Sequence, residues 1–369
     1  MKDDAAWDVF IAGAGPAGAA TALSLAAVAP GLRVCLSDAG RDEAFRVGES
    51  VPPLIQRFLD HLGLWRSFLD QGHSPSFRTL SAWGGPLLEG NEFFLHVHNT
   101  GWRLDRVCFD RWLAAEAERR GAIPLAAKVR GLSQEAGGWR IDCGGAGVHR
   151  ARCVVDATGR AASLSRLAGL RPVNHERLVA CVGFFPDTGD MERPGADAAV
   201  VEAFRDGWWY TAATPGGQRV AALMADSDWV RRLGAARLDI WREQLAATRH
   251  VRILVGREPP LAPLRIWPAG SRCLDSPLPN GLLPVGDAAS SFDPLSSQGI
   301  LKALRSGIFA SYAIADGLLR ADGGRGCARY AALMRREFHA YRSTHCDYYR
   351  QEQRWPESPF WRRRHLESR

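Results

Sequence analysis

A glycine-rich turn near the start of the chain limits the possible folds more than any other feature. The turn Gly13-Ala-Gly-Pro-Ala-Gly18 follows an apolar segment, residues 8–12, which we expect to form a strand. Small residues over 16–29 predict a helix, and residues 33–37 predict a second strand. A strand, a glycine turn, a helix and a second strand form the unit that binds dinucleotides in α/β proteins. The start of the chain therefore predicts an α/β fold with a Rossmann-like domain.

The same turn predicts where a nucleotide cofactor lies. Gly13 allows the tight turn, Gly15 lets the backbone approach a pyrophosphate, and Gly18 lets the helix pack against its strand. The free N–H groups at the helix start hold the diphosphate. Asp38, at the end of the second strand, is placed to bind ribose hydroxyls. The predicted contacts in this part of the chain are Gly13, Gly15, Pro16, Ala17, Gly18 and Asp38.

Two later fragments complete a pattern that predicts FAD. Asp156-Ala-Thr-Gly159 lies in the middle of the chain, and Gly286-Asp287 precedes Asp293-Pro294. We expect Asp287 to bind the ribitol chain of a flavin. We expect the helix after Pro294 to point its N–H groups at the isoalloxazine, because a helix N-terminus stabilises the negative charge of reduced flavin. The predicted contacts here are Asp156, Gly159, Gly286, Asp287, Pro294, Gln298, Gly299 and Ile300.

The remaining segments predict a second, mainly antiparallel β domain inserted into the first. In residues 176–269, apolar and polar residues alternate over short stretches, which is typical of half-buried strands. Residues 93–98 are expected to form another strand. We divide the chain into a discontinuous FAD-binding domain of the glutathione-reductase type, a substrate-binding domain and C-terminal helices. The FAD-binding domain covers residues 1–75, 105–175 and 270–320. The substrate-binding domain covers residues 76–104 and 176–269, and the C-terminal helices cover residues 321–369.

The composition excludes several other classes of protein. The net charge is +7, but only Lys2, Lys128 and Lys302 are lysines among the 47 basic residues. The arginines are spread along the chain, so we expect no nucleic-acid partner. No apolar run reaches the roughly eighteen residues of a membrane helix, and the short acidic start does not predict a signal peptide. The eight cysteines form no Cys-x-x-Cys pair and no cluster with histidine, which predicts reduced thiols, a cytoplasmic protein and no metal site.

These motifs resemble those of the FAD-dependent monooxygenases of the hydroxybenzoate hydroxylase class and of the related flavin-dependent halogenases. The resemblance covers most of the chain. It implies that Arg106 lies near the flavin phosphates and that the loop formed by Gly48, Glu49 and Ser50 runs beside the flavin. A solvated helix arginine at 106 and a helix-capping carboxylate at 49 are the alternatives to these assignments.

The residues near the loop favour hydroxylation over the other flavin reactions. A second glycine fingerprint and a redox cysteine pair are missing, which argues against reductases of the glutathione type. The halogenases that this chain resembles need a lysine downstream of the Gly48 loop, where the chain has Arg78. Arginine stays protonated and cannot replace a reactive amine. We therefore expect hydroxylation through a flavin C4a-hydroperoxide, with O2 as oxidant and NAD(P)H or reduced flavin, supplied by a separate flavin reductase, as donor.

Four residues are candidates for work on the substrate. Trp209 and Tyr210 lie on a predicted strand that faces the flavin in the family, where they would stack on an aromatic ring; ordinary packing is the alternative. His96, in phase with His98, would take the ring proton, or it has a structural or solvated role. Arg78 would bind a carboxylate or a peptide carbonyl, or it is a surface charge.

The substrate is predicted from the tail of the chain. Residues 348–361, Tyr-Tyr-Arg-Gln-Glu-Gln-Arg-Trp-Pro-Glu-Ser-Pro-Phe-Trp, resemble the end of flavoproteins that mature quinone-cofactor enzymes. That resemblance implies hydroxylation of a tryptophan in a partner polypeptide. A small-aromatic hydroxylase, a halogenase, a prenyl-chain reductase and a non-catalytic flavin-binding assembly factor are the alternatives.

Overall fold

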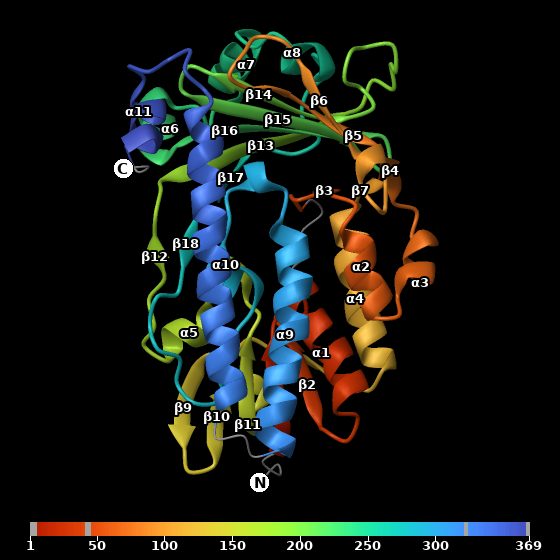
Figure 1. The fold of residues 1–369 in the computed structure, drawn as a ribbon, viewed down its shortest axis with the longest axis vertical. Helices are drawn as coiled ribbons and strands as arrows, with labels where there is room; N and C mark the ends of the chain where they lie inside the picture. The colour runs from red at the N-terminus through yellow and green to blue at the C-terminus, as the bar shows by residue number, and fades with distance from the viewer. Residues whose placement is uncertain (1–5, 41–45, 321–323, 367–369) are drawn as a thin grey trace.

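The molecule is elongated, with a sheet at each end and long helices between them (Figure 1). The computed structural model describes residues 6–40, 46–320 and 324–366. Among the helices in these ranges, none is long and apolar enough to cross a bilayer.

The lower sheet contains the strand that leads into the glycine turn. Its strands are β8 (Ile123–Ala126), β2 (Val34–Asp38), β1 (Ala6–Ala12), β11 (Val148–Asp156), β10 (Gly138–Asp142) and β9 (Gly131–Glu135), in that order, with β19 (Leu282–Pro284) also paired to β11. β8, β2, β1, β11 and β19 run parallel, and β10 and β9 add an antiparallel hairpin. Val9, Phe10 and Ile11 are all fully buried, because a parallel strand is covered on both faces.

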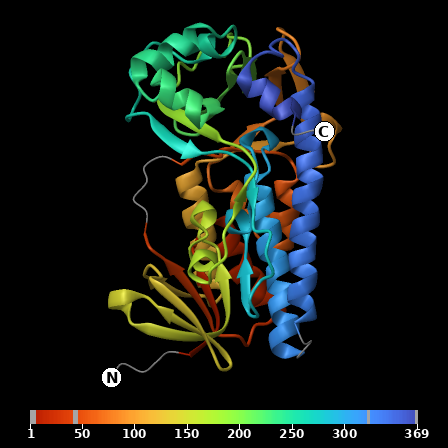
Figure 2. The ribbon, with the colours of Figure 1, turned by 90° about the vertical axis from the view of Figure 1, so that its left-hand side faces the viewer.

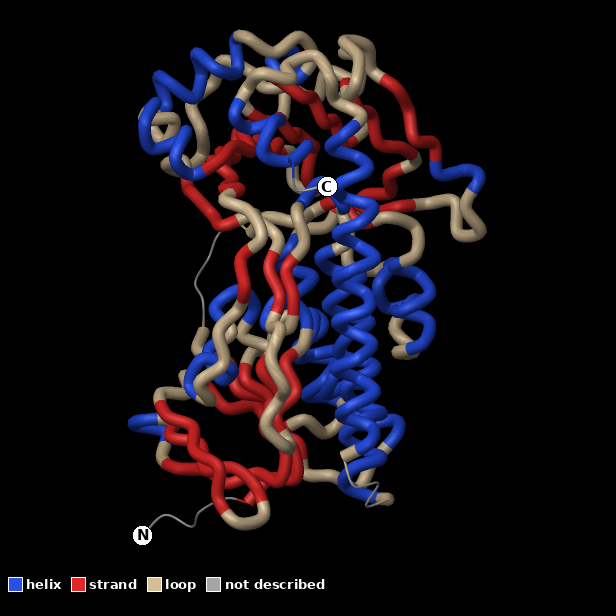
Figure 3. The backbone as a smooth tube through the Cα atoms, turned by 60° about the vertical axis from the view of Figure 1, so that its left-hand side comes forward, coloured by secondary structure: helices blue, strands red, loops and turns tan. Residues whose placement is uncertain are grey.

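Helices cover one side of this sheet, as Figure 3 shows. They are α1 (Pro16–Val28), α4 (Arg106–Arg119), α9 (Gly299–Leu319) and α10 (Arg325–Arg350). α9 lies directly against α1. The approach is so close that a Cβ added at Gly307 would stand 2.5 Å from the carbonyl oxygen of Ala17. The two helices that begin at the predicted cofactor motifs are therefore neighbours.

Two small sheets join the lower sheet to the upper one. The first contains β3 (Ser50–Val51), β7 (Gly101–Arg103) and β4 (Ser74–Ser76), and it packs on α2 (Ile55–His61) and α3 (Trp65–Leu69) through residues such as Trp102 and Phe68. The second contains β12 (Val173–Asn174), β18 (Arg272–Cys273) and β20 (Ser290–Ser291).

The upper sheet combines strands from two distant parts of the chain. Its order is β17 (Arg265–Pro268), β13 (Leu178–Pro186), β16 (Gln218–Asp226), β15 (Gly207–Thr214), β14 (Ala199–Phe204), β5 (Arg78–Ala82) and β6 (Glu89–Glu92). Every pairing is antiparallel except that of β14 with β5. α6 (Ser227–Leu233), α7 (Leu238–Ala246) and α8 (Val251–Leu254) cover its outer face, while α11 (Pro359–Leu366) lies at one end (Figures 1 and 2). The limits of the predicted domains remain a prediction.

One predicted strand is wrong. Residues 93–98 form a 3-10 turn, η1 (Phe93–Leu95), followed by a loop. Only Phe93 packs inward, under Gly101, whereas Phe94, Leu95 and Val97 are exposed. The segment therefore has no buried face against which alternating residues could pair, and His96 and His98 do not share a strand face.

Candidate active site

The three glycine-containing fragments touch one another. Gly13 has a positive φ of 107°, and a Cβ there would lie 2.3 Å from the carbonyl oxygen of Ala157. Gly286 also has a positive φ, and its Cβ would lie 2.8 Å from the Cβ of Ala17. A larger residue at either position would force these segments apart. The glycines are thus required by the convergence of segments that lie far apart in the chain.

The place where the fragments meet suits an anionic dinucleotide. A Cβ at Gly15, Gly159 or Gly299 would meet no atom within 4 Å, so the backbone at these positions borders open space. Gly15 is the N-cap of α1, which has no side-chain cap and no acidic residue in its first turn. Free N–H groups there can hold phosphate. Asp38 is exposed at the end of β2, so the residues present fit FAD.

The other predicted contacts of these motifs lie at the starts of the same two helices. α9 begins at Gly299 with Gln298 as its N-cap, and no side chain caps its N–H groups. Gly18 packs against Gly13, where a Cβ would stand 1.9 Å from the carbonyl oxygen. The predicted contacts in the first turns or just before them are Pro16, Ala17, Gly18, Pro294, Gln298, Gly299 and Ile300.

Asp156 has a different task from the one predicted. Its carboxylate is fully buried and accepts hydrogen bonds from the backbone and hydroxyl groups of both Thr158 and Ser165. These bonds hold the turn that contains Gly159 in place. Asp156 therefore shapes the loop at the site, and its own oxygen atoms are used within the chain.

Asp287 joins a buried lysine at the predicted flavin position. Lys302 Nζ donates to Asp287 Oδ1 over 2.7 Å and to the carbonyl of Ser290, and the ammonium is 4.7 Å from the ring centre of Phe292. Burial acts to raise the pKa of Asp287, but Lys302 and Arg160 outweigh it and lower that pKa. Asp287 therefore stays ionised, and its side chain is 36% exposed.

Arg106 fastens α4 to the predicted flavin loop. Its Nη1 donates to the carbonyl oxygen of Val47 over 2.5 Å, and its Nη2 lies 3.2 Å from Asp110. Gly48 has a positive φ, and a Cβ there would be 2.6 Å from this guanidinium. The side chain of Arg106 is only 15% exposed, so the alternative of a solvated surface arginine is not what the structure shows.

The buried carboxyl group of Glu49 and the hydroxyl of Tyr210 lie close together where the small sheet of β3, β4 and β7 meets the upper sheet. Glu49 accepts from the backbone N–H of Gly48 over 2.9 Å, and Ser50 Oγ lies 2.8 Å from the hydroxyl of Tyr210. Burial raises the pKa of Glu49, although Tyr210 and Arg106 partly oppose this effect. Glu49 does not cap α2, which has Leu54 as N-cap and no side-chain cap. The group can hold a proton at the point where the loop meets the upper sheet.

Trp209 points away from this group. Neighbouring residues of a strand face opposite sides, and Tyr210 and Trp208 share the inner face of β15. Trp209 is fully buried on the outer face, where its ring lies 4.8 Å from that of Trp241 in α7. The predicted stacking of Trp209 on a substrate is therefore corrected to a role in packing.

Arg78 and His96 are also placed differently from the prediction. Arg78 donates two hydrogen bonds to Asp197, of 3.0 and 3.1 Å, and lies 3.6 Å from Glu92. Its charge is neutralised within the chain, and these hydrogen bonds raise its pKa. His96 is exposed on the turn after β6. Neither residue is grouped with Glu49, Ser50 and Tyr210 by the contacts of the structure.

Sequence reasoning missed a buried network that links the flavin motif to the tail. Asp293 is fully buried and accepts hydrogen bonds from Tyr349 over 2.7 Å and from His345 over 3.1 Å. The hydroxyl of Tyr349 in turn accepts from the indole N–H of Trp208 in the upper sheet over 2.8 Å. His345 and Tyr349 are four residues apart on α10, and this spacing on one buried helix face was the available signal.

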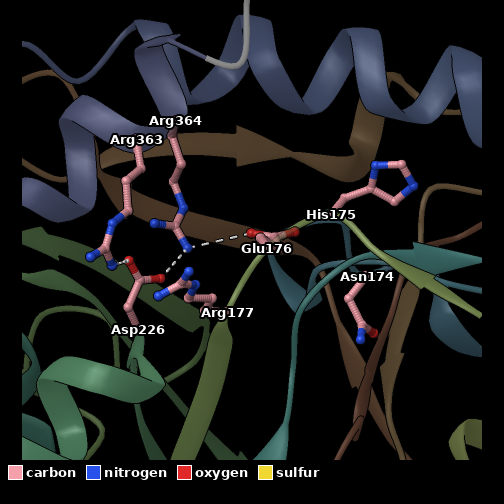
Figure 4. Close-up of a pocket in the computed structure, with 7 residues that line it drawn as sticks. All are labelled: Asn174, His175, Glu176, Arg177, Asp226, Arg363 and Arg364. Carbon is pink, nitrogen blue, oxygen red and sulfur yellow. Dashed lines mark hydrogen bonds and ion pairs between the residues drawn. The ribbon is translucent and has the colours of Figure 1, made fainter.

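A polar cavity of about 430 Å³ lies where the tail meets the upper sheet (Figure 4). Arg364 donates to Asp226 over 2.9 Å and lies 3.4 Å from Glu176, and Arg363 also pairs with Asp226. None of the lining residues belongs to a flavin motif. The cavity is lined by Asn174, His175, Glu176, Arg177, Asp226, Arg363 and Arg364. The paired charges indicate a structural joint.

The fold and the converging motifs define a flavin-dependent oxidoreductase. The chain belongs to the tryptophan halogenase family, whose sequence model matches residues 86–369. It is 32% identical, over 97% of both chains, to the putative FAD-dependent oxidoreductase LodB of Marinomonas mediterranea. It is 29% identical to 6-methylpretetramide 4-monooxygenase of Streptomyces rimosus, over 87% of this chain and 78% of that protein.

Solved structures confirm the predicted class of fold. The myxobacterial chondrochloren halogenase CndH superposes with a TM-score of 0.87 at 22% identity, covering 98% of this chain and 86% of its own. The peptidyl tryptophan dihydroxylase QhpG, which is essential for tryptophylquinone cofactor biogenesis, superposes with a TM-score of 0.78 at 27% identity, covering 98% of this chain and 79% of its own. Halogenases and a hydroxylase are thus both among the structural relatives.

Proposed function

We propose that this protein is an FAD-dependent monooxygenase that hydroxylates a tryptophan of a partner polypeptide during the formation of a quinone cofactor. The observation that carries the proposal is the arginine at position 78, where the resemblance to halogenases requires a reactive lysine. Arg78 is held by Asp197 and keeps its proton. The structure describes two lysines: Lys302 is 1% exposed and paired with Asp287, and Lys128 is exposed between β8 and β9 of the lower sheet.

Bound FAD would activate O2, from which the ring receives one oxygen atom, while the other leaves as water with two electrons from the donor and two protons. The N-termini of α1 and α9 would hold the diphosphate and the isoalloxazine edge. Asp38 would bind the ribose and Asp287 the ribitol chain. NAD(P)H, or reduced flavin from a separate reductase, would be the electron donor.

The group around Glu49 would serve the ring that is hydroxylated. A ring carbon that gains oxygen must lose its hydrogen as a proton, so a nearby base is required. Glu49 is buried with a raised pKa and lies beside the hydroxyl of Tyr210. In this proposal Glu49 takes the proton, which replaces the predicted role of His96.

A surface beside the site supports a polypeptide as the substrate. Phe77, Phe94, Leu95 and Val97 are 60%, 70%, 81% and 96% exposed, and the backbone N–H of Phe93 donates to the carbonyl of Phe77. Large apolar side chains grouped on a surface are typical of an interaction site. We call these four residues the apolar turn. It leads directly into β7, which pairs with the flavin loop at Ser50, so a partner bound there would lie next to the site.

Halogenation is the second candidate, because the family model and CndH both bear that activity in their names. Mass spectrometry of a tryptophan-containing polypeptide, incubated with FAD-loaded enzyme, NADH, a flavin reductase and both chloride and bromide, separates the two. Hydroxylation adds about 16 or 32 mass units, one or two oxygen atoms. A chlorine or bromine isotope pattern in the product would contradict the proposal.

A further inference from the structure

Arg103 makes no ion pair with any residue in the described part of the chain, and Asp197 and Asp187 act on its charge only from a distance. Its Nε and Nη1 atoms are buried and have no hydrogen-bond partner. The third nitrogen, Nη2, reaches the carbonyl oxygen of Pro75 at 3.5 Å, the outer limit of a hydrogen bond. Three other arginines differ from Arg103 in this respect: Arg78, Arg106 and Arg219 each form an ion pair with an aspartate.

The position of Arg103 brings this charge to the candidate active site. Arg103 lies on β7 directly across from Ser50 of β3 and Ser74 of β4. Residues that face each other across paired strands point to the same side of the sheet. The hydroxyl of Ser50 is 2.8 Å from that of Tyr210, so this side faces the upper sheet. Trp102, the preceding residue, packs on the other side against Phe68.

The guanidinium of Arg103 can still accept a ligand, because an oxygen atom from outside the chain could take the hydrogen bonds that it does not make within the chain. Burial and the nearby charge of Arg219 lower the pKa of Arg103, yet an arginine does not lose its proton in proteins. Guanidinium N–H groups that are buried without a hydrogen-bond partner destabilise the structure. Carbonyl and carboxylate oxygens accept the two parallel hydrogen bonds that a guanidinium offers. Arg103 is partly exposed, and the contact of its Nη2 with Pro75 is exposed, so a ligand can approach the guanidinium from the side of Nη2.

We propose that Arg103 binds a carbonyl or carboxylate oxygen of the substrate and thereby orients its aromatic ring beside Glu49 and Tyr210. This inference rests on the proposed function and assigns to Arg103 the contact predicted for Arg78. The oxygen belongs to the main chain of a polypeptide or to the carboxylate of a free aromatic amino acid. Bound flavin is the competing ligand for the guanidinium.

The test measures binding to the FAD-loaded protein through the visible absorbance of the bound flavin. Three probes are used: N-acetyl-glycyl-tryptophyl-glycinamide, which has carbonyl groups only; L-tryptophan, which has a carboxylate; and indole, which has neither. The variants are Arg103→Gln, Arg103→Lys and, as matched control, Arg66→Gln, which changes an exposed arginine on α3.

Arg103→Gln is expected to weaken the binding of one of the two oxygen-bearing probes at least tenfold, about 1.4 kcal/mol. The affinity for indole is expected to stay unchanged. The probe that loses more identifies the source of the oxygen. Arg103→Lys keeps the charge without the fork and should fall between. Arg66→Gln should match the wild type. The ligand-free melting temperature of Arg103→Gln should not fall, because the guanidinium that is removed makes only the long contact with Pro75.

Four results would overturn the inference. They are an equal loss of indole affinity, a changed FAD affinity with unchanged probe affinity, failure of both oxygen-bearing probes to bind the wild type, and a melting temperature lowered by Arg103→Gln. Product mass is recorded in parallel. Probes that bind through Arg103 but never gain oxygen would contradict the proposed hydroxylation and leave the role of Arg103 intact.

Discussion

The predicted cofactor end of the molecule, and its junction with the upper sheet at the predicted substrate end, are held together by different kinds of contact. At the predicted cofactor end, glycines such as Gly13 and Gly286 let distant backbone segments touch, and helix N-termini would supply the binding groups. Between the flavin motif and the upper sheet, side chains such as Asp293, Tyr349 and Trp208 form chains of hydrogen bonds. Backbone requirements leave a short signature in the sequence, whereas pairings between distant side chains do not.

The largest effect is expected when a backbone contact of the cofactor end is blocked. Gly13→Ala places a methyl group 2.3 Å from the carbonyl oxygen of Ala157. We expect the free energy of unfolding to fall by about 2–4 kcal/mol and FAD binding to be lost, as measured by thermal unfolding and visible absorbance. Gly31→Ala is the control, because its Cβ meets no atom within 4 Å and its φ is not positive. A yellow, stable Gly13→Ala protein would break the comparison.

The next effect is expected from the side-chain network. Tyr349→Phe removes the hydroxyl that serves both Asp293 and the indole N–H of Trp208. Buried groups left without partners cost about 1–3 kcal/mol, which urea unfolding would detect. Tyr348→Phe changes the adjacent residue, which is 40% exposed, and should be nearly neutral. Equal losses in the two variants would show that the network does not stabilise the fold.

A smaller effect, with a defined pH dependence, is expected at Glu49. Its pKa is raised in the folded state by burial, so stability falls as the pH rises from the unfolded value of about 4.3 through the folded one. Glu49→Gln removes this loss. The variant should be more stable than the wild type at pH 8. The difference should vanish at a pH near the pKa of glutamate in the unfolded chain, about 4.3. The opposite trend would mean that Glu49 is stabilised as a carboxylate.

The smallest effect on stability is expected at the apolar turn. The double change Leu95→Ser and Val97→Ser alters exposed side chains and should shift the free energy of unfolding by less than about 0.5 kcal/mol. It should nevertheless reduce hydroxylation of a polypeptide and spare that of a small aromatic compound. Leu319→Ser, at the exposed far end of α9, is the control. Unchanged polypeptide turnover would remove the turn from the proposed interface.

The same comparison explains which parts of the site could be predicted from the sequence. Gly13, Gly15 and Gly18 were recognisable because the turn imposes its own spacing on neighbouring residues. The strands of the upper sheet are predicted by their alternation, but alternation does not reveal which face is inner, so the sequence alone does not show that Trp209 packs on the outer face. Residues 93–98 alternate in the sequence but pair with no strand. That the segment turns is visible only in the folded chain, where Phe93 packs under Gly101.

Other residues of the site give no local signal at all. Arg103 looks like any of the many arginines until its lack of a partner is seen. Asp293 was recognised as part of a motif, but its donors His345 and Tyr349 follow more than fifty residues later. Their roles depend on the packing of α10 against both sheets, which is a property of the folded chain.

The contact between Asp293 and Tyr349 also has a consequence for the order of assembly during synthesis. α10 and α11 follow every glycine fingerprint in the described part of the chain, so they leave the ribosome after the fingerprints. Until they dock, Asp293 lacks the donors that His345 and Tyr349 provide. A nascent polypeptide that already contains all three fingerprints is therefore expected to capture its yellow cofactor stably only after translation has passed Tyr349.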